Sequence, residues 1–293
     1  MTTCVACPRG CGAERGEHQG SGVCGEGTLP RIARAGLHMW EEPCVSGTAG
    51  SGTVFFSGCA LRCVYCQNAA ISLGGYGKEV SATRLREIYF ELIDKGAHNI
   101  NLVNPTHFIK SVSESLSGGL SVPVVYNTGG YESVSSLKEV EGRVQVYLPD
   151  MKYALAVPAA RYSNAPDYPE TAKKAIQEMY RQTGKYKLDG EGIITRGVII
   201  RHLVLPGNIE NTLRVIDWVS ETFSSGEVLF SLMSQYTPSG DLSSYPELQR
   251  RLTAGEYEAV SDYLNESEIY DGYFQELSSA AEEYIPPFDL TGV

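Results

Sequence analysis

Short β-branched segments alternate with amphipathic helical segments from about residue 53 onward, and this alternation is the strongest constraint on the fold. The runs TVFFSG, NINLVN and VPVVYN are each followed by a segment with helical periodicity. After Ser81, for example, Leu85, Ile88 and Leu92 share one apolar stripe, which Gly96 ends. Such alternation is typical of a parallel sheet with crossover helices.

Three further runs, RVQVYL, GVIIRHLVL and EVLFSLMS, bring the number of strand and helix pairs to six. Residues 167–183 predict a helix that ends at Gly184, and KYKLDGEGIITRG predicts a hairpin around Asp189 and Gly190. The fold class is therefore α/β, and we expect a partial (β/α)6 barrel of the TIM type. A doubly wound open sheet would give the same pattern, and in both architectures functional residues lie at the carboxyl ends of the strands.

The glycine-rich stretch SGTAGSG, which covers residues 46–52, is the clearest flexible joint. It suggests a division into a Cys-rich metal-binding segment (1–46), the barrel (47–235) and an acidic helical C-terminal extension (236–293). From Asp241 onward the extension has twelve acidic residues against two arginines. We expect the extension or the Cys-rich segment to cover the open side of the barrel.

Composition excludes some classes of function. No stretch approaches the roughly 20 apolar residues that span a bilayer, and the start, MTTCVACPRG, lacks the apolar run of a secretory signal. We therefore expect a soluble, cytoplasmic protein with no membrane contact.

The net charge of −11 argues against a nucleic-acid partner. In a reducing compartment, clustered cysteines are more often metal or catalytic sites than disulfides.

Three of the eight cysteines, Cys59, Cys63 and Cys66, lie together in SGCALRCVYCQN. A structural zinc site needs four ligands, and the nearest histidines, His38 and His98, are distant in sequence. A [4Fe-4S] cluster normally takes four Cys ligands, so three would leave one iron open. An open position is what a catalytic metal site keeps for its substrate or cofactor.

Four other cysteines occur near the start of the chain, with spacings of x2, x3 and x12 and glycines between them. They are Cys4, Cys7, Cys11 and Cys24. Four ligands make a closed site, which is structural or conducts electrons. Zinc is favoured and a second iron–sulphur cluster is the alternative. Cys44 is left over and is expected to be an ordinary buried cysteine.

Polar residues recur where the predicted strands end, and a shared active-site mouth would require such a set. The candidates are Asn104, Thr106, His107, Asn127, Thr128, Asp150, Lys152, Arg201 and His202. Each has a simpler interpretation: the histidines could be satisfied core or turn residues, and Asp150 with Lys152 could be a surface ion pair. Alternate residues of a strand share one face, however, and at a barrel mouth that face is the site.

The C-x3-C-x2-C spacing directly after the first strand, with Tyr65 before the last cysteine, resembles the signature of the radical S-adenosylmethionine (SAM) superfamily. In that superfamily the three thiolates hold a [4Fe-4S] cluster whose open iron chelates S-adenosylmethionine. One electron cleaves this cofactor to methionine and a 5′-deoxyadenosyl radical, which abstracts a hydrogen atom. The resemblance implies both cofactors and a catalytic role for Cys59, Cys63 and Cys66.

A closer resemblance is to the activating enzymes of pyruvate formate-lyase and other glycyl radical enzymes. CVYCQN, YNTGGY, PDMKY and IRHLVLPGN are similar to motifs of that group. By this resemblance Tyr65 lies by the adenine, and Asn68 supports the cluster loop. The residues that it places around S-adenosylmethionine are Tyr65, Asn68, Asn127, Thr128, Asp150, Lys152 and Arg201.

Two departures from the group stand out. NLVNPTHF replaces the GGEP segment that binds the amino group of S-adenosylmethionine, so that role is expected to fall to Asn104, Pro105, Thr106 and His107 unless another residue takes it. Asn127 replaces an aspartate. The whole pattern, with its leading CPRGCG, is most similar to an activase-related (PflX-like) branch of iron–sulphur proteins.

These features predict an oxidoreductase that works anaerobically and receives electrons from a flavodoxin or ferredoxin. Its substrate could be a glycine in a glycyl radical enzyme, or alternatively a small molecule or peptide. In a third hypothesis, the protein is a non-catalytic binding scaffold and both groups of cysteines bind zinc.

Overall fold

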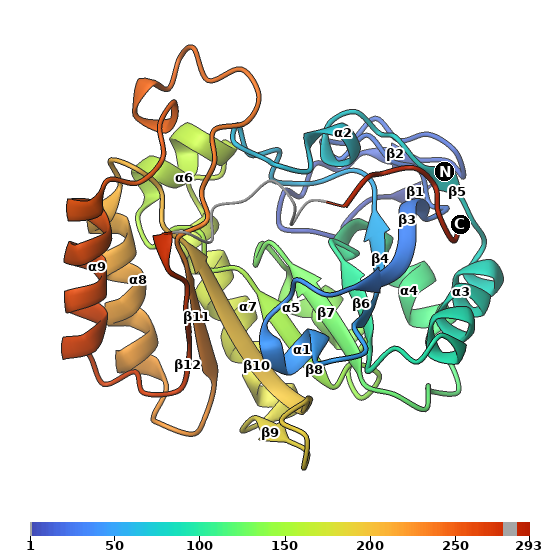
Figure 1. Cartoon of the computed structure of the whole chain (residues 1–293). Coiled ribbons are helices and arrows are strands. Elements are labelled where there is room, and N and C mark those ends of the chain that lie inside the picture. Colours follow the sequence, from blue (N-terminus) through green and yellow to red (C-terminus); the bar gives the residue numbers. More distant parts are fainter. Residues whose placement is uncertain (1, 278–285) are drawn as a thin grey trace.

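A central sheet organises the chain in the computed structural model, which describes residues 2–277 and 286–293 (Figure 1). Its strands follow the order β12-β11-β10-β8-β7-β6-β4-β3-β5. They are β3 (Arg31–His38), β4 (Ser51–Phe56), β5 (Lys78–Glu79), β6 (Ile100–Val103), β7 (Val124–Thr128), β8 (Val146–Pro149), β10 (Ile194–Leu203), β11 (Leu229–Met233) and β12 (Gly272–Phe274).

The six strands that the sequence predicts, β4, β6, β7, β8, β10 and β11, are confirmed, and neighbours in this series pair in parallel. Leu102 lies opposite Val54 on one side and Tyr126 on the other, which sets the register. The path of the sheet ends at β12 and β5, so the sheet is not closed and the predicted barrel is not confirmed. A mixed α/β fold with a central sheet is what the structure shows.

Helices lie between the strands along the chain. They are α1 (Pro43–Ser46), α2 (Ala69–Ser72), α3 (Ala82–Asp94), α4 (Ile109–Ser115), α5 (Val134–Lys138), α6 (Ala156–Ser163), α7 (Tyr168–Thr183), α8 (Ile209–Thr222) and α9 (Ala254–Glu266). Two short 3₁₀ turns cover Thr106–Phe108 and Pro246–Leu248. Ser81 caps α3 by accepting the Arg84 N–H at 3.1 Å, and α7 ends at Gly184, as predicted.

β3, β5 and β12 extend the sheet beyond its six parallel strands, and β5 pairs antiparallel with β3. β3 pairs antiparallel with β4, and β12 pairs in parallel with β11. Residues 286–293 lie beside β3, where Leu290 and Thr291 exchange main-chain hydrogen bonds with Ala33 and Ala35 (Figure 1). β9 (Lys187–Leu188) pairs antiparallel with β10, which confirms the predicted hairpin.

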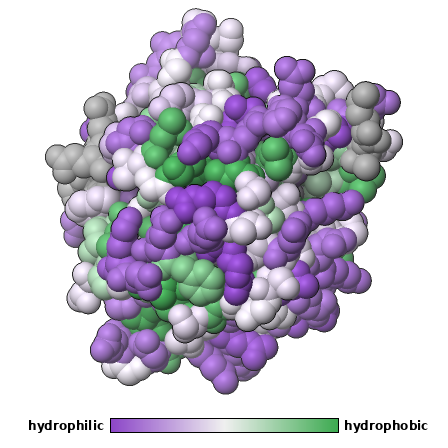
Figure 2. Space-filling model, turned by 90° about the vertical axis from the view of Figure 1, so that its right-hand side faces the viewer, coloured by the Kyte–Doolittle hydropathy of each residue, from purple (hydrophilic) through white to green (hydrophobic). Residues whose placement is uncertain are grey.

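The predicted three-part division of the chain stays a prediction, although the sheet takes in β3 from before residue 47 and β12 from after residue 235. Within the described part of the acidic extension, α9 packs beside α8 (Figure 1); residues 278–285 of the extension lie outside the described residues. On the face seen in Figure 2, hydrophobic side chains form small groups between hydrophilic ones. No helix among the described residues has the length and apolar character needed to cross a membrane.

Candidate functional site

A cavity of about 290 Å³ lies at the carboxyl ends of the parallel strands. Eleven residues singled out from the sequence line it, so residues from across the sheet meet in one place. They are Cys59, Cys63, Tyr65, Cys66, Asn68, Asn104, Asn127, Thr128, Asp150, Lys152 and Arg201. The convergence follows from the topology, because parallel strands carry their carboxyl ends to the same edge of a sheet.

The three cysteines lie on the loop between β4 and α2, and all are free thiols. Each sulphur has a hydrogen-bonding neighbour. The Leu61 N–H donates to Cys59 Sγ at 3.4 Å, and the hydroxyl of Ser163 donates to Cys63 Sγ at 3.0 Å. Cys66 Sγ lies 3.2 Å from Ser72 Oγ. Such contacts are the usual surroundings of metal-bound sulphur.

The donor set fits an iron–sulphur cluster. Burial raises the pKa of Cys63 to about 12, while the nearby Lys152 cation acts in the opposite direction. A buried thiolate therefore needs further positive charge, which iron ions would supply. In residues 2–277 and 286–293, no three His, Cys, Asp or Glu side chains converge on one ion position. A cluster does not need that arrangement, since each of its thiolates binds a different iron.

Arg201 on β10 is the centre of a charged network beside the cysteines. Its Nε lies 3.0 Å from Asp150 Oδ1, and its Nη2 donates to Asn127 Oδ1 at 2.6 Å. Its Nη1 lies 3.1 Å from Glu41 Oε2. Lys152 Nζ donates to the other oxygen of Asp150 at 2.5 Å. Two basic side chains thus alternate with two acidic ones in this network.

The charges of this network hold one another in the ionised state. Burial alone would raise the pKa of Asp150, but Lys152 and Arg201 outweigh it and lower that pKa below its usual value. Burial would likewise lower the pKa of Lys152, yet Asp150 and the Cys63 sulphur raise it. At neutral pH Asp150 and Lys152 are therefore held as an ion pair, and neither is poised to exchange a proton.

Glu41 is a site residue that the sequence reasoning missed. It lies between β3 and α1, and its Oε1 accepts from Asn101 at 2.9 Å and from Asn127 at 3.1 Å. It supplies a carboxylate beside Asn127, where the activating enzymes carry an aspartate. The available signal was the acidic pair Glu41 and Glu42, which directly precedes the apolar α1 and of which Glu42 is buried.

Three predicted residues do not line the cavity. Thr106 directs its hydroxyl to Glu132. His107 is buried and its Nε2 donates to the Ser57 carbonyl at 2.7 Å. His202 is buried, with Nδ1 donating to the Met151 carbonyl at 2.6 Å and Nε2 at 2.9 Å from the hydroxyl of Thr212.

Desolvation lowers the pKa of each of these two histidines to about 4, so both rings are neutral at pH 7. Asn104 does line the cavity, but its side chain donates to the Gly58 carbonyl at 2.6 Å. It therefore braces the start of the cysteine loop.

Tyr65 begins a chain of hydroxyl groups that ends on a cysteine. Its Oη lies 2.8 Å from Tyr153 Oη, which lies 2.8 Å from the hydroxyl of Ser163. Ser163 in turn donates to Cys63. Desolvation raises the pKa of Tyr65 well above its usual value, so its hydroxyl keeps its proton.

The four leading cysteines lie around a small hairpin of β1 (Thr2–Thr3) and β2 (Glu14–Arg15). A Cβ added to Gly22 would lie 3.2 Å from Cys11 Sγ and 4.0 Å from Cys24 Sγ, so the backbone at Gly22 passes close to both sulphurs. Burial raises the pKa of Cys7 to about 12, against a hydrogen bond from the Arg9 backbone. Four thiols are a donor set that zinc or a cluster would take, but among the described residues they do not converge on one ion position.

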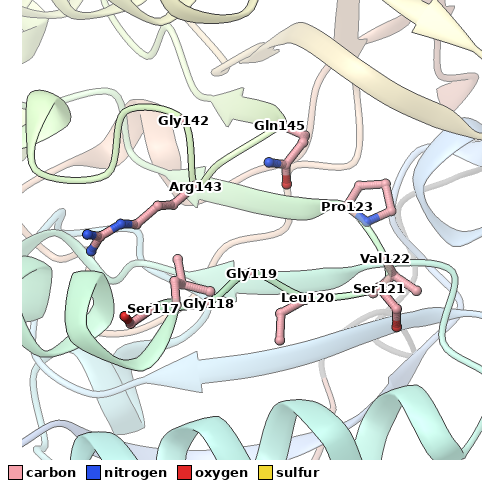
Figure 3. A pocket seen from close by; sticks show the side chains of 11 residues that line it. Ser117, Gly118, Gly119, Leu120, Ser121, Val122, Pro123, Gly142, Arg143 and Gln145 are labelled. Atoms are coloured by element: carbon pink, nitrogen blue, oxygen red, sulfur yellow. The ribbon is translucent and has the colours of Figure 1, made fainter.

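A second cavity, of about 400 Å³, lies at the opposite edge of the sheet (Figure 3). It is formed by residues 116–123 before β7 and by Gly142, Arg143 and Gln145 before β8. Arg143 donates to the carbonyl and hydroxyl of Ser113. This cavity is at the amino ends of the strands and contains none of the predicted residues, so the cavity beside the cysteines is the candidate site.

Comparison with known proteins locates an iron–sulphur domain. The 4Fe-4S single cluster domain family matches residues 45–111, a range that contains Cys59, Cys63 and Cys66. The uncharacterized protein MJ0674 of Methanocaldococcus jannaschii is 30% identical over 246 residues, which are 80% of this chain and 66% of that protein. The chain thus spans just under two thirds of this relative.

The fold is similar to that of SuiB from Streptococcus suis, which was solved bound to S-adenosylmethionine. The TM-score is 0.51 at 13% sequence identity, over 77% of this chain and 50% of SuiB. The domain match thus covers the three cysteines, and the likeness to SuiB shows a shared fold.

Proposed function

We propose that this protein is a radical SAM enzyme in which Cys59, Cys63 and Cys66 hold a [4Fe-4S] cluster. The observation that carries the proposal is the meeting of three free thiols with the polar strand ends in one cavity. Three ligands leave a position for S-adenosylmethionine, which SuiB also binds. When bound, the cluster and this cofactor supply a 5′-deoxyadenosyl radical that abstracts hydrogen from a substrate.

The residues of the chain would bind and orient the cofactor and exclude water. Asn127, Asp150, Lys152 and Arg201 present fixed charges and amides at the strand ends, where a zwitterionic amino acid group can be held by opposite charges. Because these side chains are already paired with one another, they need little reorganisation on binding. Tyr65 borders the same cavity and is proposed to pack against the adenine.

For the substrate, we propose a small molecule or a short peptide. Trp40 and Glu41, from the segment after β3, line the cavity together with Pro286 from the segment beside β3. Segments from both ends of the chain thus reduce the opening that a folded partner's loop would need. A primary-carbon radical also requires such cover against side reactions.

The second candidate substrate is a glycine of a glycyl radical enzyme. It is favoured by the motifs YNTGGY and PDMKY, whose residues Asn127, Asp150 and Lys152 all border the cavity. This candidate predicts a stable glycine radical signal on mixing with the partner enzyme.

We propose a reduced flavodoxin or ferredoxin as electron donor and an anaerobic, cytoplasmic setting. The leading cysteines are proposed to bind zinc, with a second iron–sulphur cluster as the alternative. A scaffold with zinc at both sites is the non-catalytic alternative.

Metal and sulphide analysis of anaerobically purified protein tests the proposal. The triple variant C59A/C63A/C66A should lose about four irons and retain the second metal. Cys44→Ala is the matched control, since Cys44 is buried outside the cavity and should keep all metals. Added S-adenosylmethionine should change the electron paramagnetic resonance (EPR) spectrum of the reduced wild-type cluster. Zinc in place of iron at the three cysteines would refute the enzyme hypothesis.

A further inference from the structure

The segments that carry the two groups of cysteines are in contact, although they are separate in sequence. Gly58 begins the loop of Cys59, Cys63 and Cys66 and has a φ of +79°. A Cβ at this position would lie 2.9 Å from the Cys24 carbonyl oxygen and would also collide with Glu26. The start of the three-cysteine loop is therefore packed directly against the backbone of the leading cysteine segment.

Arg9, which lies between Cys7 and Cys11, reaches across this contact. Its Nε donates to the Ala60 carbonyl at 2.8 Å, and its Nη2 donates to the carbonyls of Ser163 at 2.7 Å and Leu61 at 3.4 Å. Its Nη1 donates to the Asn164 carbonyl. One guanidinium thus joins the three-cysteine loop to the end of α6, and hydrogen bonds from a charged donor are stronger than neutral ones.

Arg62 makes the corresponding contact in the other direction. It lies between Cys59 and Cys63, and its Nη1 donates to the Val23 carbonyl, next to Cys24, at 3.1 Å. Its φ of +52° is in the left-handed region, which an arginine rarely adopts. Each cysteine segment therefore holds the other through an arginine placed between two of its own cysteines.

The contacts of Arg9 extend to the sulphur atoms themselves. Its backbone N–H is hydrogen-bonded to the Cys7 thiol. Ser163, whose carbonyl accepts from the Arg9 guanidinium, also donates its hydroxyl to Cys63 Sγ at 3.0 Å. Arg9 and Ser163 together connect a sulphur of one group to a sulphur of the other.

We propose that Arg9 and Arg62 are positioning residues that form a reciprocal clamp, through which the metal-bound leading segment fixes the loop of Cys59, Cys63 and Cys66. The proposal rests on the proposed cluster at that loop. Within described residues 2–30, which carry the four leading cysteines, the secondary structure is limited to a hairpin of two two-residue strands, so a bound metal would help to hold Arg9 in place. Losing that metal would then loosen the loop without removing any ligand of the cluster.

The rate of iron loss to a chelator tests the clamp in the anaerobic holoprotein. In R9Q and in R62Q, iron held by the three-cysteine loop should be lost at least about tenfold faster, because R9Q loses four charged hydrogen bonds and R62Q loses one. R9K should not restore the rate, because an ammonium cannot reach several carbonyls as the planar guanidinium does. R84Q is the matched control, since Arg84 pairs with Glu87 and Glu91 on the surface of α3.

The EPR spectrum and midpoint potential of the reduced cluster should also shift in R9Q and stay unchanged in R84Q, which a general loss of stability would not produce. Rates in R9Q and R62Q within about twofold of the wild-type rate would overturn the proposal.

Hydrogen exchange gives a second test that needs no cluster. Removing the leading metal with C7S/C24S should increase exchange in residues 59–66 by about tenfold, while residues 116–123 at the opposite edge of the sheet serve as an internal control. Unchanged exchange in residues 59–66 after metal loss would refute the clamp. A protein that never binds iron at Cys59, Cys63 and Cys66 would instead refute the proposed function, and the exchange test would still stand.

Discussion

Glu132 provides the clearest prediction of pH dependence. It follows β7 and is buried, with only 1% of its surface exposed. The hydroxyls of Thr106 and Thr128 donate to its Oε1, and the Tyr126 hydroxyl lies 3.5 Å from its Oε2. Burial raises the pKa of Glu132 to about 7, although the three hydroxyls act in the opposite direction.

The size and sign of the effect follow from linkage. The pKa rises from 4.5 to about 7 on folding, and at about 1.4 kcal/mol per tenfold change in proton affinity this corresponds to roughly 3 kcal/mol. The folded state favours the protonated acid, so this stability is fully present below pH 4.5. It is lost as the pH rises from about 4.5 to about 7 and changes little above that.

The variant E132Q removes the titrating group but keeps an acceptor for the hydroxyls. We would measure the free energy of unfolding in urea, anaerobically, at pH 5 and pH 8. Between these values the wild-type protein should lose roughly 2 to 3 kcal/mol relative to E132Q. E87Q is the control, since Glu87 is exposed on α3. The same pH dependence in E132Q as in the wild-type protein would refute this reasoning.

Two other substitutions test the site. Glu41→Gln leaves the buried Arg201 with fewer charged partners; we expect a loss of roughly 2 to 3 kcal/mol in the free energy of unfolding. The control Glu91→Gln breaks a surface pair and should cost at most about 0.5 kcal/mol; equal losses would contradict the network. Ser163→Ala removes the hydroxyl that donates to Cys63. A lost hydrogen bond of about 1 kcal/mol should lower the midpoint potential of the cluster by about 40 mV. An unchanged potential in a redox titration would show that this contact does not tune the cluster.

The sequence was sufficient for the parallel part of the fold. The stripe of Leu85, Ile88 and Leu92 is buried on α3, and the β-branched runs became neighbouring parallel strands in chain order. This succeeded because strand and helix alternation depends on local periodicity, which every segment carries in its own residues. β3 was missed, since RIARAGLH has small and charged residues and is a strand mainly through its pairing with β4.

The site was predicted where residues follow strands directly, and less well where it depends on distant segments. Asn127, Asp150, Lys152 and Arg201 border one cavity because parallel strands bring their ends together. Glu41 borders the cavity because the chain passes beside it after β3, and no local sequence pattern predicts that path.

His202 was expected at the cavity, but its side chain does not line it. It follows Arg201 on the same strand, so its side chain points to the other face, where Met151 and Thr212 bind it. Both residues lie at the end of a strand, and this position alone did not show which of them faces the cavity. The alternation of side chains between the two faces of a strand would have shown it.

Formation of 5′-deoxyadenosine tests the central claim most directly. Anaerobically purified protein, reduced with dithionite and given S-adenosylmethionine, should produce 5′-deoxyadenosine and methionine. The triple variant C59A/C63A/C66A should produce none, and Cys44→Ala should match the wild-type protein. Absence of 5′-deoxyadenosine from wild-type protein that contains a complete, reduced cluster, or equal amounts from the triple variant, would contradict the account.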